Sequence, residues 1–386
     1  MSFKKISSLV LSLSLILGIL TACSNKLDKE TLPSVTETSE TETEPSETTP
    51  ESTEPAHGPN STAKVTDMPV PSHGQLAVSG TNLVDQNGEV VQLKGMSSYG
   101  INMCANFFNA DIVQTLAEDW GCTVLRLAMT TKGNSDDYIR DPDKYFNEIC
   151  EYVNQCIAQG IYVIVDWHIL YDGDPNEYKA ESVDFFTRLS ALYGDQPNII
   201  YEICNEPNGM RFDNPDAPVD WANTVKPYAE EVVAAIRAND PDNIIIIGSP
   251  NWSQDVDIAS ADPVSGTNLM YTCHFYAGSH GQELRDKVAT AISNGAAVFV
   301  TEWGTTNDSG KGQLYTDEST EWINYLNENN ISWCNWSIGG SDAEASNALK
   351  FKSSILTIEE KYAGHWPDEF ITNSGLFVRG LILGEE

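Results

Sequence analysis

Short apolar segments alternate with amphipathic segments through most of the chain. The apolar segments are five to seven residues long, a length typical of buried strands rather than helices. We predict eight strands: Val91–Gly95, Thr123–Met129, Ile161–Trp167, Ile199–Ile203, Ile244–Gly248, Leu269–His274, Ala297–Glu302 and Ile331–Trp336. Helical spacing of apolar residues between them predicts helices that bury one face. The clearest helices are Pro142–Ala158, Tyr178–Tyr193, Trp221–Ala238, Gln282–Asn294 and Asp317–Asn329.

Eight successive strand–helix units predict an α/β protein with the (β/α)8 TIM-barrel fold. A doubly wound sheet is the alternative, but eight evenly spaced units fit it less well. Ahead of the first unit, Leu76–Val91 predicts a hairpin with its turn at 85–88, where the sequence is Asp-Gln-Asn-Gly. In a TIM barrel, functional side chains lie at the carboxyl ends of the strands.

The charge balance narrows the range of partners. The 386 residues include 22 Lys and Arg against 56 Asp and Glu, a formal net charge of −34. Phosphate binding needs clustered basic residues, so a nucleic-acid partner is excluded, as is electrostatic docking on anionic lipid. A neutral polymer or an uncharged small ligand suffers no such repulsion.

The eight cysteines include no CxxC pair and are widely scattered. Setting aside Cys23, discussed next, seven remain. An odd, scattered set is not the pattern of a disulfide framework or of a zinc site. Several lie in apolar segments, where a free thiol behaves as a small buried apolar group. We therefore expect most of them to be reduced core residues.

The first residues resemble an export signal. Lys4 and Lys5 precede the apolar segment 9–20, which is too short to span a bilayer comfortably. This segment ends in Leu-Thr-Ala-Cys at 20–23, which resembles the bacterial lipoprotein cleavage box. The resemblance implies a signal peptide over 1–22, cleavage before Cys23 and lipid attachment to its thiol. The alternative is an ordinary signal peptide followed by a chance cysteine. A lipoprotein would be exported and anchored at the bacterial cell surface.

The next segment is predicted to be a disordered tether. Thr31–Pro55 contains twelve Ser or Thr, seven Glu and four Pro, and only Leu32 and Val35 are apolar. Such a composition cannot bury enough apolar surface to offset the entropy of ordering. We expect residues 23–71 to form the tether and residues 72–386 to form one catalytic domain.

Polar and aromatic side chains gather where the predicted strands end. They are His168, Asn205, Glu206, Trp252, His274, Tyr276, Glu302 and Trp336, together with Arg126 from within the second strand. A lone Glu at a strand end is more often an ion-pair partner, and pattern alone leaves His168 equally open to a structural role. Apolar neighbours favour core positions for Trp120, Trp167, Trp303 and Trp333. His168, His274 and the two glutamates lack the spacing of a helical metal site, so we predict no metal.

Several of these residues form motifs that resemble those of a known enzyme family. Asn-Glu-Pro at 205–207 together with Glu302 resembles glycoside hydrolase family 5 of clan A, in its bacterial endo-β-1,4-glucanase subgroup. The resemblance extends through Arg126 and through five segments, at 163–170, 252–255, 274–278, 302–304 and 333–337. It covers nearly everything from Leu76 to the end of the chain. It implies a TIM barrel that hydrolyses β-1,4-glucosidic bonds without a cofactor.

The resemblance also implies roles for the two carboxyl groups. Glu206 is expected to be the acid/base and Glu302 the nucleophile, which gives retention of anomeric configuration. Arg126 is a cation able to keep Glu302 ionised, whereas a less polar setting near a negative charge would keep Glu206 protonated. Asn205 resembles the residue that hydrogen-bonds the sugar 2-hydroxyl, and Tyr276 is expected to contact Glu302.

The remaining candidates are expected to hold the sugar. His168 and His274 should hold the acid/base and the sugar at the cleavage subsite. Trp336 offers a flat face for a sugar ring, and Trp252 is a further substrate-binding candidate. Tyr99 is also a candidate, because it stands where relatives carry a histidine near the cleavage subsite.

Three segments depart from the family pattern. Met103 and Cys104 stand where relatives carry a Trp-Tyr pair that stacks sugar, and Thr130 replaces a Tyr. The segment 338–341 lacks a Lys that relatives place there. The catalytic machinery is complete, but the distal glycone subsites are expected to be altered. Tyr99 or a nearby loop residue is the alternative source of a sugar platform.

We therefore predict a retaining endo-β-1,4-glucanase acting on cellulose or a related β-glucan, as a monomer without nucleic-acid or metal partners. The nearest alternative is the same chemistry on β-mannan, xyloglucan or mixed-linkage glucan. A different class is a non-catalytic carbohydrate-binding lipoprotein. Retention of both Glu206 and Glu302, with Arg126, Asn205 and Tyr276, argues against that class.

Overall fold

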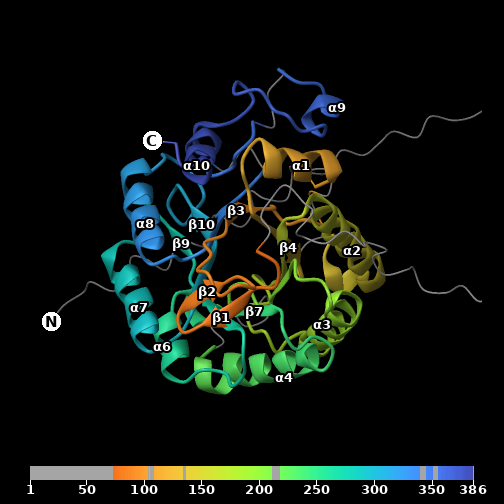
Figure 1. The fold of residues 1–386 in the computed structure, drawn as a ribbon, viewed down its shortest axis with the longest axis vertical. Coiled ribbons are helices and arrows are strands. Elements are labelled where there is room, and N and C mark those ends of the chain that lie inside the picture. The colour runs from red at the N-terminus through yellow and green to blue at the C-terminus, as the bar shows by residue number, and fades with distance from the viewer. Residues whose placement is uncertain are drawn as a thin grey trace, which may run out of the picture.

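Eight parallel strands close into a barrel in the computed structural model of the protein (Figure 1). The structure describes residues 73–102, 104, 108–133, 136–210, 218–339, 345–350 and 355–385. The barrel strands are β3 (Lys94–Ser97), β4 (Val124–Thr130), β5 (Tyr162–His168), β6 (Ile199–Glu202), β7 (Ile244–Ile247), β8 (Leu269–Thr272), β10 (Val298–Gly304) and β11 (Trp333–Trp336). Strand β11 pairs in parallel with both β3 and β10, which closes the ring. The predicted TIM barrel is confirmed.

Helices form the outer ring of the barrel. They are α1 (Ala110–Glu118), α2 (Pro142–Gln159), α3 (Lys179–Tyr193), the π-helical η6 (Trp221–Val225) continuing into α4 (Lys226–Arg237), α6 (Val256–Ala261), α7 (Gln282–Ser293), α8 (Thr316–Glu328), α9 (Ile358–Lys361) and α10 (Asn373–Leu383). The short α5 (Pro250–Ser253) instead follows β7 and lies against the end of β6. Helix α2 shows why these bounds hold. The side chain of Asp141 caps its start ahead of Pro142, and Gly160 ends it with a φ of 74° that favours glycine.

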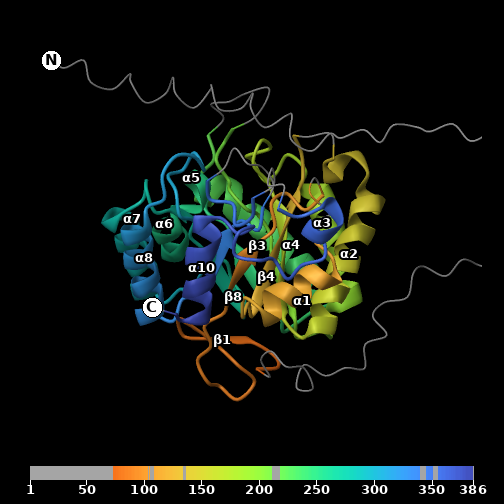
Figure 2. The ribbon, with the colours of Figure 1, turned by 90° about the horizontal axis from the view of Figure 1, so that it is seen from above.

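A small hairpin closes the amino-terminal end of the barrel (Figure 2). Strands β1 (Ala77–Ser79) and β2 (Asn82–Val84) pair antiparallel and turn at residues 80–81. The predicted turn at 85–88 is present as well, as a second turn, in which the Gly88 N–H donates to the Asp85 carbonyl at 2.9 Å. It returns the chain so that Val84 pairs antiparallel with Val90. The prediction missed only the additional turn at 80–81 between β1 and β2. Leu76 and Leu83 pack against the barrel floor.

The interior of the barrel is apolar at the bottom and polar at the top. Ile164, Ile200 and Phe299 belong to the apolar floor. Side chains two residues apart share one face of a strand, so the next interior positions on these strands are Asp166, Glu202 and Thr301. All three are fully buried. Polar side chains of the strands themselves therefore form a layer directly above the apolar floor.

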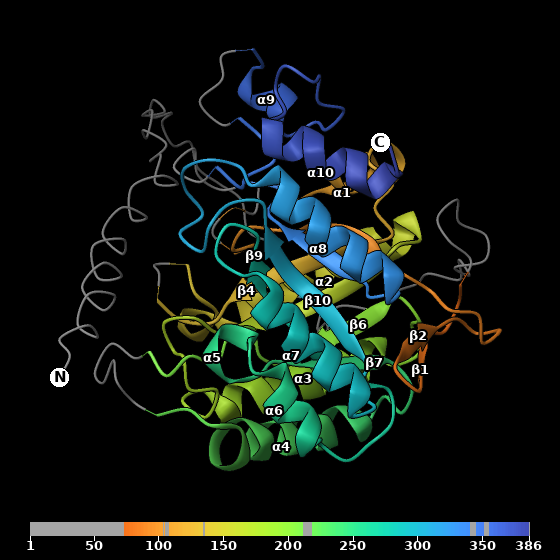
Figure 3. The same ribbon diagram turned by 90° about the vertical axis from the view of Figure 1, so that its left-hand side faces the viewer.

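The last helix supports the strand that carries Glu302. Figures 1 and 3 place α10 beside α8 and α1 on the outside of the barrel. Ser374, in the first turn of α10, lies 2.8 Å from the hydroxyl of Thr305, which follows β10 directly. Both hydroxyls are buried. The carboxyl-terminal segment thereby fixes the chain just beyond the end of β10.

Two further predictions concern the described residues. The seven cysteines there carry free thiols, and all but the half-buried Cys150 are buried, as expected for core residues. Trp120, Trp167, Trp303 and Trp333 are fully buried, which confirms them as core. Across the described ranges, no helix has both the length and the apolar character needed to cross a membrane. Cys23, the signal segment and the tether lie outside the described residues.

Candidate active site

Arg126 organises the floor of the barrel mouth. Its guanidinium is fully buried in the middle of β4 and contacts three carboxylates. Nη1 lies 3.0 Å from Oε2 of Glu302, Nε lies 2.7 Å from Oε2 of Glu202, and Nη2 lies 2.9 Å from Oδ2 of Asp166. Nη2 also donates to Oδ1 of Asn205 at 2.6 Å. A planar fork of five donors suits such a cluster, which a lysine could not bridge.

Glu302 is held as an ionised carboxylate. Arg126 donates to its Oε2, and the Tyr276 hydroxyl donates to its Oε1 at 2.8 Å. Burial alone would raise its pKa, but the charges of His274, Arg126 and His168, together with the Tyr276 hydrogen bond, lower the pKa of Glu302 below its usual value. The expected contacts with Arg126 and Tyr276 are both present.

A break in strand register turns Glu302 toward the mouth. Adjacent strand residues normally face opposite sides of a sheet, yet Thr301 and Glu302 both contact interior groups. The pairing of β10 with β11 shifts register between Val300 and Trp303. Such irregularities next to active sites re-aim a side chain. This one allows consecutive residues to serve the same site.

Glu206 carries the opposite pKa shift. It follows β6 and is 8% exposed, and its Oε1 lies 3.0 Å from Nδ1 of His274. Burial raises the pKa of Glu206, and the negative charge of Glu302 adds to this, against the opposing influence of His274 and His168. A raised pKa keeps a carboxylic acid protonated near neutral pH, so Glu206 is suited to donate a proton.

The two carboxyl groups lie close enough to act on one bond. Ligand atoms of Glu206, His274 and Glu302 all lie within 4.8 Å of one another. Retaining glycosidases separate their carboxyl groups by about 5–5.5 Å and inverting ones by about 6.5–9.5 Å. An upper limit of 4.8 Å between the nearest ligand atoms is shorter than the inverting spacing and agrees with the expected retaining arrangement. Three such groups could also approach a cation, but each already has a protein partner in the acid–base network.

Asn205 is fixed beside this pair. Its Oδ1 accepts from Arg126, and its Nδ2 donates to the carbonyl of Ile169 at 3.0 Å. An amide NH2 group carries two protons, so one remains for a ligand. This geometry agrees with the expected contact to a sugar hydroxyl.

The ring of Trp336 is positioned by two neighbours. His168 lies parallel to it, with centroids 5.3 Å apart and planes 2° apart, and Tyr99 lies tilted against it at 5.5 Å. His168 is itself fixed, because its Nδ1 lies 2.7 Å from Oδ2 of Asp166. The structure thus brings the three ring candidates together at the mouth and ties them to the Arg126 cluster through Asp166.

Trp252 stands on an unusual turn. Asn251, Trp252 and Ser253 all have positive φ, at 58°, 56° and 56°. Such conformations are uncommon in non-glycine residues and gather at functional sites. The buried Ser253 hydroxyl donates to the Asn205 carbonyl at 2.6 Å, which holds the turn against the end of β6. The Trp252 side chain is 38% exposed and is available to a ligand.

The departures from the family pattern are only partly visible. Cys104 is 8% exposed and packs in the hydrophobic core, so it offers no sugar platform. Thr130 is also buried, and its backbone N–H donates to Asn102. Met103 and the residues 340–341 lie outside the described part of the chain.

Sequence reasoning missed Glu202 and Thr301. Glu202 bridges Arg126 and the Thr301 hydroxyl, with Thr301 Oγ1 2.7 Å from Glu202 Oε1. Both residues lie inside apolar strand segments. The signal was available for Glu202, because a charged residue within the apolar run Ile-Ile-Tyr-Glu-Ile at 199–203 must find a buried partner.

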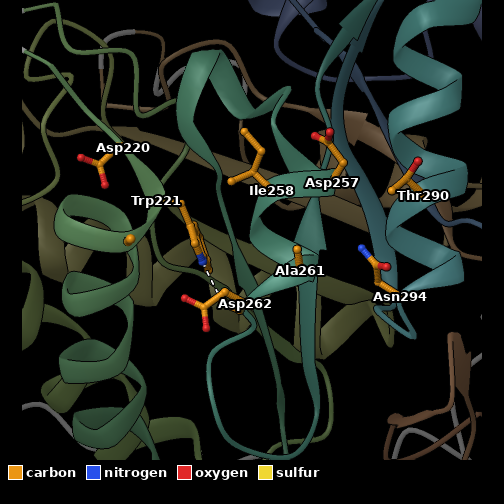
Figure 4. A pocket seen from close by; sticks show the side chains of 9 residues that line it. Asp220, Trp221, Asp257, Ile258, Ala261, Asp262, Thr290 and Asn294 are labelled. Atoms are coloured by element: carbon orange, nitrogen blue, oxygen red, sulfur yellow. Dashed lines mark hydrogen bonds between the residues drawn. The ribbon is translucent and has the colours of Figure 1, made fainter.

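A second hollow lies away from this network, between η6, α6 and α7 on the outside of the barrel (Figure 4). Its lining includes Trp221, Ile258 and Asp262. Trp221 is nearly fully buried, and its indole N–H donates to the Asp262 carbonyl at 2.8 Å. Its ring is therefore a structural element of the helix contact rather than an exposed platform.

The barrel and its paired carboxyl groups define the class of (β/α)8-barrel glycoside hydrolases. A family model described as cellulase, glycosyl hydrolase family 5, matches residues 84–342. The chain belongs to this family, as its motifs predicted.

Two curated relatives illustrate the match. The chain is 49% identical over 311 residues to an endoglucanase of Clostridium saccharobutylicum, which covers 81% of this chain and 65% of that protein. It is 48% identical over 292 residues to endoglucanase A of Evansella cellulosilytica, which covers 76% of this chain and 56% of that protein. The chain therefore spans less than two thirds of the length of these relatives.

Solved structures agree with the fold. The catalytic domain of alkaline cellulase K has a TM-score of 0.76 at 34% identity, covering 83% of this chain and 96% of that one. An endoglucanase catalytic domain of Thermobifida fusca, solved in complex with cellotetraose, has a TM-score of 0.74 at 31% identity. That match covers 83% of this chain and all of the other.

Proposed function

We propose that this chain is a retaining endo-β-1,4-glucanase that cleaves internal bonds of cellulose or a related β-glucan. One observation carries the proposal. An ionised Glu302, held by Arg126 and Tyr276, lies within 4.8 Å of a Glu206 whose pKa is raised. Retaining glycoside hydrolysis needs one ionised carboxylate and one protonated carboxylic acid, and two carboxyl groups whose pKa values are shifted in opposite directions provide them.

In the first step, a Glu302 oxygen attacks the anomeric carbon of the sugar. The glycosidic C–O bond breaks, and the proton of Glu206 moves to the departing oxygen. Arg126 and Tyr276 each hold one oxygen of the nucleophile, which orients the carboxylate without neutralising it. As Glu302 becomes an ester, it loses its negative charge, which removes one of the two influences that raise the pKa of Glu206. The pKa of Glu206 therefore falls, and Glu206 can remain ionised for the second step.

In the second step, Glu206 is ionised and acts as a base. It takes a proton from water, the water oxygen attacks the same anomeric carbon, and Glu302 leaves as a carboxylate. Two inversions at one carbon give net retention. The free amide proton of Asn205 is placed to bind the sugar 2-hydroxyl, a contact that strengthens at the transition state.

The substrate class rests on ring contacts, charge and relatives. Trp336 and the exposed Trp252 give the mouth two aromatic surfaces for neutral sugar rings. A net charge of −34 repels anionic polymers but not neutral ones. The relatives named endoglucanase, and the T. fusca domain bound to cellotetraose, favour a β-1,4-glucan.

A reducing-sugar assay on several polysaccharides tests the proposal. We expect activity on hydroxyethyl cellulose, which is soluble and uncharged, and on mixed-linkage β-glucan, with β-mannan and xyloglucan as the alternative substrates. Glu302→Ala should abolish turnover while leaving the fold intact. NMR of the first anomer formed should show the β-configuration. An inverted product would overturn the role of Glu302, and activity on no β-glycan would support a binding protein instead.

We also propose that the protein is exported and anchored to the cell surface by lipid on Cys23. The charged residues Lys4 and Lys5, the short apolar segment 9–20 and the Leu-Thr-Ala-Cys box at 20–23 support this. An acidic Ser/Thr/Pro-rich segment then separates the anchor from the domain. A tether of this kind would let a fixed enzyme reach a polymer too large to approach the membrane.

A further inference from the structure

A hydroxyl group connects two charged residues beneath the acid/base. Oγ1 of Thr301 lies 2.7 Å from Oε1 of Glu202 and 2.9 Å from Nε2 of His274. On its third side it lies 2.6 Å from Oγ1 of Thr272. His274 Nδ1 in turn lies 3.0 Å from Oε1 of Glu206. An unbroken chain of contacts therefore runs from Glu202 through Thr301 and His274 to the acid/base.

Counting protons fixes the direction of each bond. A threonine hydroxyl has one proton to donate and two lone pairs to accept with. Glu202 is ion-paired with Arg126 at 2.7 Å, and an ionised carboxylate can only accept, so the Thr301 proton points to Glu202. Oγ1 of Thr301 must then accept from Nε2–H of His274 and from the Thr272 hydroxyl. The Thr301 backbone N–H donates to Oγ1 of Thr272 at 3.2 Å, which agrees with this assignment.

No other group replaces this link among the described residues. Nε2 of His274 lies 3.7 Å from Oε1 of Glu202, too far for a direct hydrogen bond. His274 is 2% exposed, and Thr301, Glu202 and Thr272 are 0% exposed. Water therefore cannot accept a hydrogen bond from Nε2 of His274. The Thr301 hydroxyl is the acceptor for that nitrogen.

We propose that Thr301 is a positioning residue for the acid/base, its hydroxyl holding a proton on Nε2 of His274 and so fixing how Nδ1 meets Glu206. This rests on the proposed function in taking Glu206 as the acid/base. Without the Thr301 hydroxyl, Nε2 of His274 has no acceptor for its proton and is expected to lose it. His274 then carries its proton on Nδ1, facing Glu206, and Glu206 is ionised. An ionised Glu206 has no proton for the departing sugar.

Several charged groups face His274, and they determine whether its pKa is raised or lowered. Glu202 and Glu206 approach it from β6 and the residues that follow, and Glu302 approaches it from β10. Arg126, on β4, pairs with Glu202 and Glu302. Burial works against a charge on His274, but its contacts with Glu202 and Glu206 and the charge of Glu302 raise its pKa to about 9. His274 and Glu206 share one proton across the Nδ1–Oε1 contact, while Thr301 holds a second proton on Nε2. Removing the link to Glu202 should make this pair give up its second proton at lower pH.

The test compares Thr301→Val with Thr301→Ser. Valine keeps the shape and removes the hydroxyl, whereas serine keeps the hydroxyl. For Thr301→Val we expect kcat/KM on cellotetraose to fall by about tenfold to a hundredfold, a partial loss of the roughly hundredfold to ten-thousandfold that acid–base catalysis contributes. The alkaline limb of the kcat/KM profile should move to lower pH by about one unit, the size of one hydrogen bond to a charged group. Thr301→Ser should stay close to the parent protein on both measures.

A second substrate separates proton donation from general damage. 2,4-Dinitrophenyl β-cellobioside has a leaving group that needs no proton, so Thr301→Val should lose far less activity on it than on cellotetraose. Thr272→Val removes a hydroxyl from the same buried layer without touching His274, and it should leave the alkaline limb in place. Equal shifts in the Thr301→Val and Thr272→Val variants would mean altered packing and would overturn the proposal.

A measurement that needs no turnover completes the test. In 15N-histidine-labelled protein, NMR should show a proton on Nε2 of His274 in the parent and in Thr301→Ser, and its loss from Nε2 in Thr301→Val. An unchanged tautomer in a folded Thr301→Val variant would overturn the role of Thr301. Inactivity of the parent protein on every β-glucan would instead overturn the proposed function, so the two failures are distinguishable.

Discussion

The Tyr276 hydroxyl donates to Oε1 of Glu302 at 2.8 Å, on the opposite oxygen from Arg126. This hydrogen bond is one of the contacts that lower the pKa of Glu302. Tyr276→Phe should therefore raise that pKa and move the acid limb of the kcat/KM profile to higher pH, by about half a unit to one unit. The pH–rate profile on hydroxyethyl cellulose, which has no titrating group of its own in this range, measures this, and an acid limb that stays in place would contradict it.

Removing the cation at the centre should cost stability as well as activity. Arg126→Met leaves Asp166, Glu202 and Glu302 buried without their partner. Breaking a buried ion pair by removing one side typically costs about 3–5 kcal/mol. Urea unfolding should show a loss of this order. Arg188→Ala is the matched control, because that arginine is 34% exposed and its surface ion pairs should contribute less than about 1 kcal/mol.

Much of this site could be predicted from the sequence because the change from apolar to polar residues marks where each strand ends. An apolar segment followed by a polar residue located Glu206, His274 and Glu302 at one rim once the barrel closed, and Arg126 was recognised as a charged residue inside an apolar strand. The position of β3 was less accurate, since it begins at Lys94 rather than Val91. The preceding apolar residues pack into the floor with the hairpin and so look like part of the strand.

The buried polar layer was harder to predict. In the sequence, Thr301 looks like an ordinary β-branched strand residue. Its hydroxyl has a recognisable role only once the fold brings it beside Glu202 and His274. Those partners come from residues 99 and 27 positions away along the chain. The register shift that lets Thr301 and Glu302 face the same way has no local sequence signal either. The strand ends can be recognised locally, whereas this network depends on closure of the barrel.

Stability toward acid should depend on Glu202. Burial disfavours its charge, but Arg126 outweighs this and lowers the pKa of Glu202 from 4.5 to about 2. Because the folded-state pKa is the lower one, this stabilisation is complete above about pH 4.5 and is lost as the pH falls toward 2. Chemical denaturation from pH 7 to 3 should show the loss, and the slope should be smaller in Glu202→Gln. An identical slope in the two proteins would contradict the shifted pKa.

Asp166 should act in the opposite direction and so serves as an internal check. Burial raises its pKa to about 6, with Arg126 opposing. Since the folded state keeps this proton to higher pH than the unfolded state, stability should fall as the pH rises from about 4 through 6. Asp166→Asn should remove that decline. Carboxyl 13C NMR of Asp166 across the same pH range would report this step directly.

Lipid attachment makes a prediction that is independent of the fold. Labelled fatty acid should enter the full-length protein but not Cys23→Ala, which should appear free outside the cell. Cys150→Ala is a matched control, because its half-buried thiol lies in the catalytic domain and should leave labelling unchanged. Unlabelled full-length protein in the medium would contradict the anchor.

Substrate choice should follow from the altered glycone side. Stacking a sugar ring on an aromatic face contributes about 1 kcal/mol beyond area burial, if other aromatic contacts are a guide. Cys104 is buried and Thr130 carries no ring, so two platforms expected in the family are missing. Their loss should weaken glycone binding by roughly tenfold, because about 1.4 kcal/mol is one decade. We expect poorer activity on cellulose than on soluble or mixed-linkage β-glucan.

Met103→Trp and Tyr99→Ala separate the two explanations for that side. Restoring a ring at Met103, which the sequence alone places there, should lower KM on cello-oligosaccharides with little change in kcat. Tyr99 lies against Trp336 at 5.5 Å, so it either supports that ring or provides a platform of its own. If Tyr99→Ala raises KM while Met103→Trp leaves KM unchanged, the subsite is built from Tyr99 instead. Measuring both variants on cellotriose and cellopentaose shows which ring the distal sugars use, because the longer substrate places additional sugars in subsites further from the cleavage point.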